Sequence, residues 1–145
     1  DSSTSRGLGD VYKRQELSSR QTAFLVDVRT KEEWTFVGVP DLASLGKQTI
    51  FIEWQEYPNM SYNPSFVDML MEEIGSKPVD KIFFLCRSGV RSMEAANALS
   101  NHLSNSGKNI RCVNVAEGFE GDMNLEKHRG CSSGWKARDL AWRQY

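Results

Sequence analysis

The chain has 145 residues, and its 18 Lys and Arg residues nearly balance its 19 Asp and Glu residues, for a formal net charge of -1. That length suits one domain whose buried core needs no disulfide or metal to hold it. A near-neutral charge argues against a dedicated nucleic-acid-binding protein, which carries a strong basic excess, and no apolar run is long enough to span a bilayer. We therefore expect neither nucleic acid nor a membrane among the partners.

The three cysteines, Cys86, Cys112 and Cys131, form no C-x-x-C pair. The sequence thus predicts neither a zinc ribbon nor a thioredoxin motif, and a disulfide framework is not favoured in a chain of this size. An odd number of scattered cysteines indicates free thiols in a reducing compartment, for which the cytoplasm is the default. No metal or cofactor is expected.

Residues 1–15 differ in composition from the rest of the chain. They are polar, rich in Gly and Ser at their start, and show neither strand nor helix periodicity. They contain no apolar stretch of the kind that a secretory signal requires. The string SSTSRGLGDVYKRQ resembles translated adapter read-through in assembled environmental sequence data, and the alternative is a natural disordered terminus. We expect a non-native or disordered segment over 1–15 and one folded domain over 16–145.

The first expected elements are a strand, a short helix and a second strand. Ala23–Val28 is a short apolar run of the kind that is buried in a sheet. Behind it, Thr30 and Glu33 form a capping box, which predicts a helix that begins at Lys31. A second β-rich run covers Thr49–Trp54.

The middle of the chain predicts a helix, a strand and a longer helix. Asn63-Pro64 is a cap residue followed by a proline, and the apolar residues behind it recur at helical spacing until Gly75. The run Lys81–Leu85 predicts the third strand. The apolar residues that mark the following helix are Met93, Ala96, Leu99 and Leu103.

The end of the chain completes the pattern with a fourth strand over Ile110–Val115, a turn over Gly118–Gly121 and a last short helix after Gly134. Strands that alternate with helices predict the α/β class, here a central and mainly parallel sheet of 4–5 strands flanked by helices on both faces. Ligands of such sheets bind at the carboxyl ends of the strands. The segments that directly follow the strands in the sequence are therefore the candidates for a site.

The segment behind the third strand carries the strongest chemical signal. Cys86 ends the strand, and Gly89 lies in a short loop before a helix. Unpaired N–H groups and the dipole at that helix start favour negative charge on the sulfur, and Arg87 and Arg91 add fixed positive charges. Gly89 allows the backbone to curl into an anion-binding nest. This predicts a thiolate nucleophile that attacks an anionic substrate and holds a charged product, although a buried structural cysteine before a solvated basic loop is the alternative.

Three segments resemble the rhodanese (sulfurtransferase) family. The run Cys86-Arg87-Ser88-Gly89-Val90-Arg91-Ser92 is similar to the active-site pattern C-R-x-G-x-R-S of that family. Leu25 to Thr30 with Glu33-Trp34 resembles its L-x-D-V-R-x-x-x-E-[FW] segment, and Asn114-Val115 with Glu117-Gly118-Phe119 resembles its strand and G-G-[FWY] turn. The segments occur in family order and at family spacing, and the resemblance covers about Glu16 to Tyr145.

The resemblance implies a rhodanese-like domain that transfers sulfane sulfur. Cys86 would take the outer sulfur of thiosulfate or a related small anionic donor as a persulfide. It would then pass that sulfur to cyanide or to a thiol acceptor, protein thiols included. The loop that binds the donor and the persulfide would comprise Arg87, Ser88, Gly89, Val90, Arg91 and Ser92.

Asp27 and Arg29, at the end of the first strand, are expected to support the site. Their role is either to orient the catalytic loop through an ion pair or only to form a buried structural pair, which we favour. Breaking such a pair would cost about 3–5 kcal/mol if it is buried.

Two alternatives remain open at this stage. Related phosphatases and arsenate reductases use a C-x5-R loop, whereas Arg91 follows Cys86 in a C-x4-R loop, which disfavours that chemistry. The domain could instead pass the same persulfide to one protein partner, as a relay or interaction module with little small-molecule turnover.

The sequence departs from the family pattern at one place. The common H-I-P-G-A segment of the family is absent, and Gly38-Val39-Pro40-Asp41 stands where it would begin.

Overall fold

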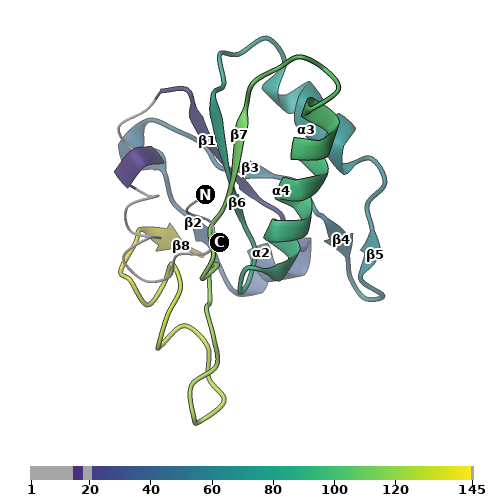
Figure 1. Ribbon diagram of the computed structural model, residues 1–145. Coiled ribbons are helices and arrows are strands. Elements are labelled where there is room, and N and C mark those ends of the chain that lie inside the picture. The colour runs from purple at the N-terminus through teal and green to yellow at the C-terminus, as the bar shows by residue number, and fades with distance from the viewer. Residues whose placement is uncertain (1–14, 18–20, 145) are drawn as a thin grey trace.

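A computed structural model describes residues 15–17 and 21–144 of the chain. The segment 1–15, which we expected to be non-native or disordered, therefore lies outside the described residues except for Gln15. At the centre of the fold is a four-stranded sheet in the order β3-β1-β6-β7, and all of its neighbouring strands are parallel (Figure 1). Its strands are β1 (Ala23–Asp27), β3 (Ile50–Phe51), β6 (Lys81–Leu85) and β7 (Arg111–Asn114).

The register of the sheet brings the segments behind the strands together. Asp27 at the end of β1 pairs with Leu85 at the end of β6, and Phe84 pairs with Asn114 at the end of β7. Every residue of β6 is buried, as expected for an apolar strand in the middle of a parallel sheet. The residues that follow β1, β6 and β7 consequently share one edge of the sheet, which is where the α/β class places its ligands.

Two helices, α3 (Phe66–Ile74) and α4 (Val90–Leu103), cover one face of the sheet (Figure 1). They bury Phe66, Leu70 and Leu99 against strand residues such as Ile82 and Phe84. The predicted end of α3 at Gly75 is confirmed. Its expected start differs slightly, because the Asn63 side chain accepts the Ser65 amide at 3.0 Å and the helix begins only at Phe66.

The other face of the sheet is covered mostly by irregular chain. Leu25, Phe83 and Leu85 pack there against Phe119 and Trp135 of the C-terminal segment. A short 3-10 helix, η2 (Ala43–Leu45), lies on the same side. This confirms the predicted α/β class with a parallel sheet covered on both faces, although one of the covering layers contains little regular helix.

The expected last helix after Gly134 is wrong. The amides of Trp135 and Lys136 donate to the carbonyl groups of Gly118 and Phe119, at 2.8 and 3.2 Å, so the segment is bound across to the turn behind β7. Strand β8 (Trp142–Arg143) then pairs antiparallel with β2 (Val39–Pro40). These long-range partners satisfy backbone groups of the segment, among them two amides that would have no partner within a helix beginning there.

Two shorter elements complete the fold. The capping box predicted at Thr30 and Glu33 is confirmed, and it begins helix α2 (Lys31–Phe36). The second expected strand is shorter than Thr49–Trp54, because only β3 is regular and the chain then turns into a hairpin. That hairpin consists of β4 (Gln55–Glu56) and β5 (Ser61–Tyr62), and it extends from the sheet next to α3 (Figure 1).

Candidate active site

Cys86 lies between the end of β6 and the start of α4, as the sequence predicted. The Gly89 amide donates a hydrogen bond of 3.1 Å to Cys86 Sγ. Gly89 caps the helix with a φ of 109°, a left-handed conformation that side chains rarely adopt. An added Cβ at Gly89 would lie 2.2 Å from the Ala116 carbonyl oxygen. The loop therefore needs glycine here both for its curvature and for the close approach of the chain behind β7.

A buried chain of hydrogen bonds reaches the sulfur from its other side. Ser92 Oγ lies 3.2 Å from Cys86 Sγ and 2.5 Å from Asn114 Oδ1. Asn114 Nδ2 in turn donates to the Gly89 carbonyl at 3.1 Å, so Asn114 joins the middle of the loop to its end at Ser92. The hydroxyl of Ser92 has one proton, and the carboxamide oxygen of Asn114 can only accept it. In this arrangement the Ser92 oxygen is left to accept from the Cys86 thiol.

Asn114 is a site residue that our sequence reasoning did not identify. We placed it only in the fourth strand, although it is a buried polar residue at the carboxyl end of that strand. A polar side chain at this position of an otherwise apolar run was the available signal, because buried polar groups require partners.

Arg91 forms an ion pair with Glu33. Its two terminal nitrogens donate to the two carboxylate oxygens of Glu33 at 2.6 and 2.9 Å, a bidentate arrangement. Burial alone would lower the pKa of Arg91, but its hydrogen bonds and attraction to Glu33 outweigh this and raise the pKa, with smaller contributions from Cys86 and Asp27. The pair connects α2 with α4 and leaves Arg91 as a support of the loop.

The Arg91–Glu33 pair predicts a pH-dependent stability. Burial would raise the pKa of Glu33, but Arg91 and the Thr30 amide together hold it below its ordinary value. A lowered folded-state pKa means that the stabilisation is present above about pH 5 and is lost as acid protonates Glu33. We expect Glu33→Gln to lose roughly 1.5–3 kcal/mol of unfolding free energy at pH 7. The difference from the parent protein should shrink at pH 3.5, and urea unfolding at both pH values measures it.

The matched control for this prediction is Glu72→Gln, because Glu72 is an exposed carboxylate on α3. It should unfold like the parent protein at both pH values. An equal loss at pH 7 and pH 3.5 for Glu33→Gln would contradict the assignment.

Asp27 and Arg29 form a fully buried pair beneath the site. The side chains of both are 0% exposed, and Arg29 Nη2 donates to Asp27 Oδ2 at 2.6 Å and to the Gly38 carbonyl at 2.9 Å. The guanidinium also lies 4.3 Å from the centre of the Phe119 ring. These contacts join β1 to the chain around Gly38 and to the turn behind β7, which supports the structural alternative.

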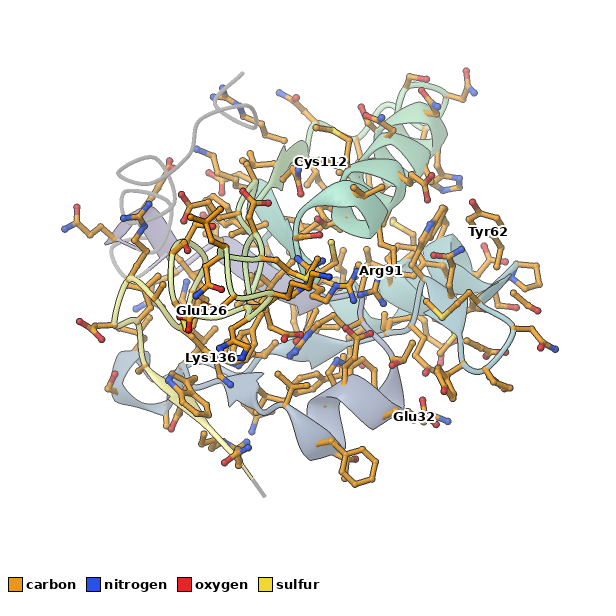
Figure 2. All side chains as sticks on the ribbon, turned by 90° about the horizontal axis from the view of Figure 1, so that it is seen from below. Glu32, Tyr62, Arg91, Cys112, Glu126 and Lys136 are labelled. Atoms are coloured by element: carbon orange, nitrogen blue, oxygen red, sulfur yellow. The ribbon has the colours of Figure 1, made fainter. Side chains whose placement is uncertain are left out.

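Cys86 forms part of the floor of a cavity of about 850 Å³, here called the Cys86 cavity. The Cys86 side chain itself is only 1% exposed. Of the predicted loop residues, Arg87, Ser88, Val90 and Arg91 line this cavity, whereas Gly89 and Ser92 lie behind its floor. Figure 2 views the molecule from this end, with Arg91 near the middle of the view and Glu32 beside α2.

The other two cysteines lie outside the Cys86 cavity. Cys112 is half-buried, and burial raises the pKa of its thiol to about 11. Cys131 is exposed. Neither Cys112 nor Cys131 is therefore among the residues that line the cavity of Cys86.

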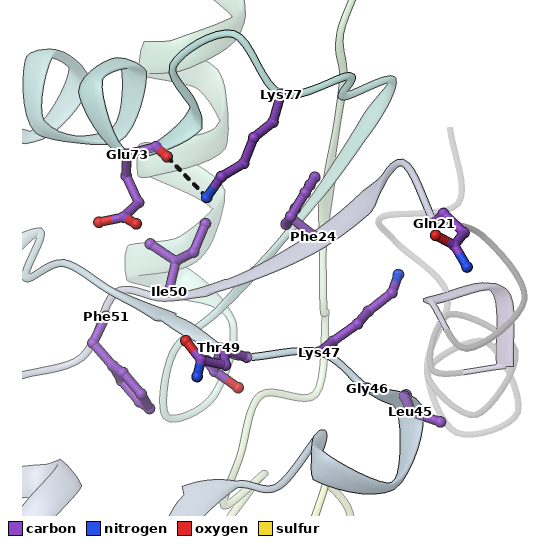
Figure 3. A pocket seen from close by; sticks show the side chains of 11 residues that line it. Gln21, Phe24, Leu45, Gly46, Lys47, Thr49, Ile50, Phe51, Glu73 and Lys77 are labelled. Carbon is purple, nitrogen blue, oxygen red and sulfur yellow. Dashed lines mark hydrogen bonds between the residues drawn. The ribbon is translucent and has the colours of Figure 1, made fainter.

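A second cavity, of about 590 Å³, contains no cysteine (Figure 3). Its most polar feature is Lys47, whose ammonium group donates to the carbonyl oxygens of Leu17 and Ala23, both at 2.7 Å. Burial lowers the pKa of Lys47. Because these bonds hold the amine against backbone, we interpret Lys47 as a structural residue.

Within residues 15–17 and 21–144, no group of three His, Cys, Asp or Glu side chains could hold a metal ion. In the same part of the chain, none of the helices has the length and apolar character needed to cross a membrane.

Comparison with known proteins shows the family of this chain. The sequence model of the rhodanese-like domain matches residues 10–124. Protein RC0915 of Rickettsia conorii is 44% identical over 126 residues, which cover 87% of this chain and 87% of that relative. Protein RP600 of Rickettsia prowazekii is 44% identical over 120 residues, 83% of this chain and 82% of its own length.

A solved structure agrees with these relatives. The crystal structure of Rv0390 from M. tuberculosis superposes with a TM-score of 0.81 at 38% identity, over 94% of this chain and 95% of that one. The parallel sheet, the loop between β6 and α4 and the match over most of the sequence lead to the same conclusion: this chain belongs to the rhodanese-like domain family.

Proposed function

We propose that this protein is a sulfurtransferase that carries sulfane sulfur as a persulfide on Cys86. The observation that carries the proposal is the position of Cys86 Sγ, which lies at the floor of the Cys86 cavity and accepts the Gly89 amide at the start of α4. Backbone N–H groups and the dipole at a helix start stabilise a sulfur anion, either the thiolate or the persulfide. The donor is thiosulfate or a related small anion, and the acceptor is cyanide or a thiol.

The proposed reaction has two displacement steps. The Cys86 thiolate attacks the outer sulfur of thiosulfate, the S–S bond of the donor breaks, and sulfite leaves with the electron pair. Cyanide then attacks the outer sulfur of the Cys86 persulfide, the new S–S bond breaks, and thiocyanate leaves while the electron pair returns to Cys86. Because the persulfide bond is about 2.05 Å long, it extends the reactive sulfur from the buried Sγ into the cavity.

The other loop residues support these steps without reacting. Arg87 is exposed on the cavity wall, where its fixed charge can receive the anionic donor. Arg91 braces the loop through Glu33. When Cys86 loses its proton, Ser92 can turn its hydroxyl from Asn114 toward the sulfur and donate to the thiolate.

The length of the loop supports sulfur transfer over phosphatase or arsenate reductase chemistry. The C-x4-R loop is one residue shorter than the C-x5-R loop of phosphatases and arsenate reductases, so it suits one added sulfur better than a tetrahedral oxyanion. The relay alternative keeps the same persulfide and differs only in the acceptor. Because Cys86, Cys112 and Cys131 are free thiols, we keep the reducing cytoplasm as the expected compartment.

The decisive test is incubation with thiosulfate followed by cyanide, with thiocyanate measured over time. We expect Cys86→Ala to reduce the rate of thiocyanate production by about 10³-fold or more, because the residues that line the cavity include no other cysteine that could act as the nucleophile. Cys131→Ala, which removes an exposed thiol outside the cavity, is the matched control and should keep the parent rate.

Intact mass separates the possible results. A gain of one sulfur atom on Cys86 without thiocyanate production favours the relay alternative. Release of phosphate from a phosphate ester, or no sulfur gain from thiosulfate or inorganic polysulfide, would contradict the proposed sulfur transfer.

A further inference from the structure

An apolar rim surrounds the opening of the Cys86 cavity. It consists of Phe36, Tyr57, Met60 and Val90, all of which line the cavity. Phe36 is 77% exposed, Val90 69% and Tyr57 61%. These residues come from three separate places, namely the end of α2, the connection between β4 and β5, and the start of α4. Exposed apolar side chains that gather around one opening indicate an interaction site rather than random surface scatter.

The cavity is large for the small molecules of the proposed reaction. Thiosulfate has five non-hydrogen atoms and cyanide has two, whereas the volume of about 850 Å³ is that of a cavity able to hold a drug-sized ligand. A small thiol on the floor would leave the rim side chains in water. An occupant that covers Phe36, Tyr57 and Val90 together must reach all three elements at once.

The charges of the cavity walls indicate the chemistry of that occupant. Three arginines and three glutamates line the cavity, so its side-chain charges balance. One opposite pair, Arg91 with Glu33, is already joined. Arg87, which follows Cys86 in the chain and is exposed on the cavity wall, supplies positive charge beside the floor. The walls therefore suit a largely uncharged body that brings a single anionic sulfur to the floor.

We propose that the acceptor is a cysteine of a partner protein that lies between apolar side chains on an accessible peptide segment. This inference rests on the proposed function and names the acceptor for it. The acceptor thiolate is complementary to the positive charge of Arg87 beside the floor. The apolar neighbours of the acceptor cysteine are complementary to the apolar rim, and its uncharged backbone is complementary to walls whose side-chain charges balance.

The transfer step follows from that placement. The acceptor thiolate attacks the outer sulfur of the Cys86 persulfide. The bond between Cys86 Sγ and the outer sulfur breaks, its electron pair remains on Cys86 as a thiolate, and the acceptor keeps the outer sulfur as a new persulfide. Since the outer sulfur extends beyond the buried Sγ, the acceptor can reach it without entering the loop.

The test uses single-turnover transfer from persulfide-loaded protein, prepared with thiosulfate or, if needed, inorganic polysulfide. The acceptors are two blocked five-residue peptides with a central cysteine, one with leucine and one with serine on both sides of it, and free cysteine. We expect the leucine peptide to react about tenfold faster than the serine peptide or free cysteine, an advantage of about 1.4 kcal/mol that partial burial of the two leucines against the rim supplies. Intact mass of peptide and protein measures the transfer.

Variants of the rim connect that preference to the structure. The double variant Phe36→Ser with Tyr57→Ser should reduce the leucine-to-serine ratio to below about threefold. The matched control is Met69→Ser with Leu125→Ser, which also removes two exposed apolar side chains but none that line the cavity. It should keep the full ratio. Circular dichroism of each variant verifies that it is folded.

The outcomes separate the two levels of the proposal. If Cys86 loads with sulfur and cyanide discharges it, but the leucine peptide has no advantage, the acceptor inference is wrong while the proposed function stands. Equal or faster discharge by free cysteine would instead identify a small thiol as the acceptor. If Cys86 gains sulfur from neither donor, both the proposed function and this inference fail.

Discussion

Gly89→Ala is expected to lose both sulfur loading on Cys86 and a large part of the stability. The new Cβ would lie 2.2 Å from the Ala116 carbonyl oxygen, and the φ of 109° is one that alanine rarely adopts. Neither partner of this clash can yield easily, because Ala116 lies buried in the chain behind β7 and Asn114 is bonded to the Gly89 carbonyl. Overpacking and backbone strain together should cost roughly 2–5 kcal/mol.

The same substitution should also disturb the chemistry. Relief of the clash must move the Gly89 amide, which is the hydrogen-bond donor to Cys86 Sγ. Loss of one such donor at a developing anion costs about 10²–10³-fold in rate. Urea unfolding measures the stability, and thiocyanate production measures the activity at a temperature where the variant is folded.

Gly107→Ala is a matched control for this prediction. Gly107 also has a positive φ, of 77°, but an added Cβ there would meet no atom within 4 Å. It should cost only about 1–2 kcal/mol from the backbone conformation and keep the parent activity. If Gly89→Ala were no more destabilising than Gly107→Ala, the close packing of the loop against Ala116 would not be a constraint.

Asp27→Asn is expected to destabilise the protein by about 3–5 kcal/mol, a factor of more than a hundred in the folding equilibrium. The substitution keeps the size of the side chain and removes only its charge. The Arg29 guanidinium, which is 0% exposed, would then remain charged in the interior without its counter-charge. Its remaining contacts with the Gly38 carbonyl and the Phe119 ring cannot neutralise that charge.

Two comparisons separate a structural role from a catalytic one. The double variant Asp27→Leu with Arg29→Met removes both charges and should recover much of the lost stability. Asp68→Asn on α3, at an exposed position, should change little. If the pair is structural, kcat/KM of folded Asp27→Asn with thiosulfate should stay near the parent value. A large loss in kcat/KM of the folded variant would show that the pair orients the catalytic loop.

The sequence predicted those features that depend on neighbours in the chain. The capping box at Thr30 and Glu33 is a contact over three residues, and Cys86 follows its strand and precedes its helix within a few positions. Such local patterns need no knowledge of the remaining fold. They were sufficient to predict the α/β class and the position of the reactive loop.

The end of the chain shows where local patterns were not sufficient. The apolar residues after Gly134 indicated a helix, but the backbone there is bound to Gly118 and Phe119 and ends in a strand paired with Val39–Pro40. The residues that stabilise this segment are far away from it in the sequence. Local propensity is a weak preference, and such tertiary contacts routinely override it.

The sequence by itself thus predicted the kind of chemistry that we propose, from a cysteine at a helix start, two arginines and a glycine in a seven-residue loop. Only the tertiary structure decided what surrounds this loop. Glu33 meets Arg91 from 58 positions away, and Asn114 meets Ser92 across 22. The apolar rim, too, forms only because α2, the β4–β5 hairpin and α4 converge at one edge of the sheet. Contacts between distant segments follow from the register of the strands, which neither spacing nor composition encodes locally.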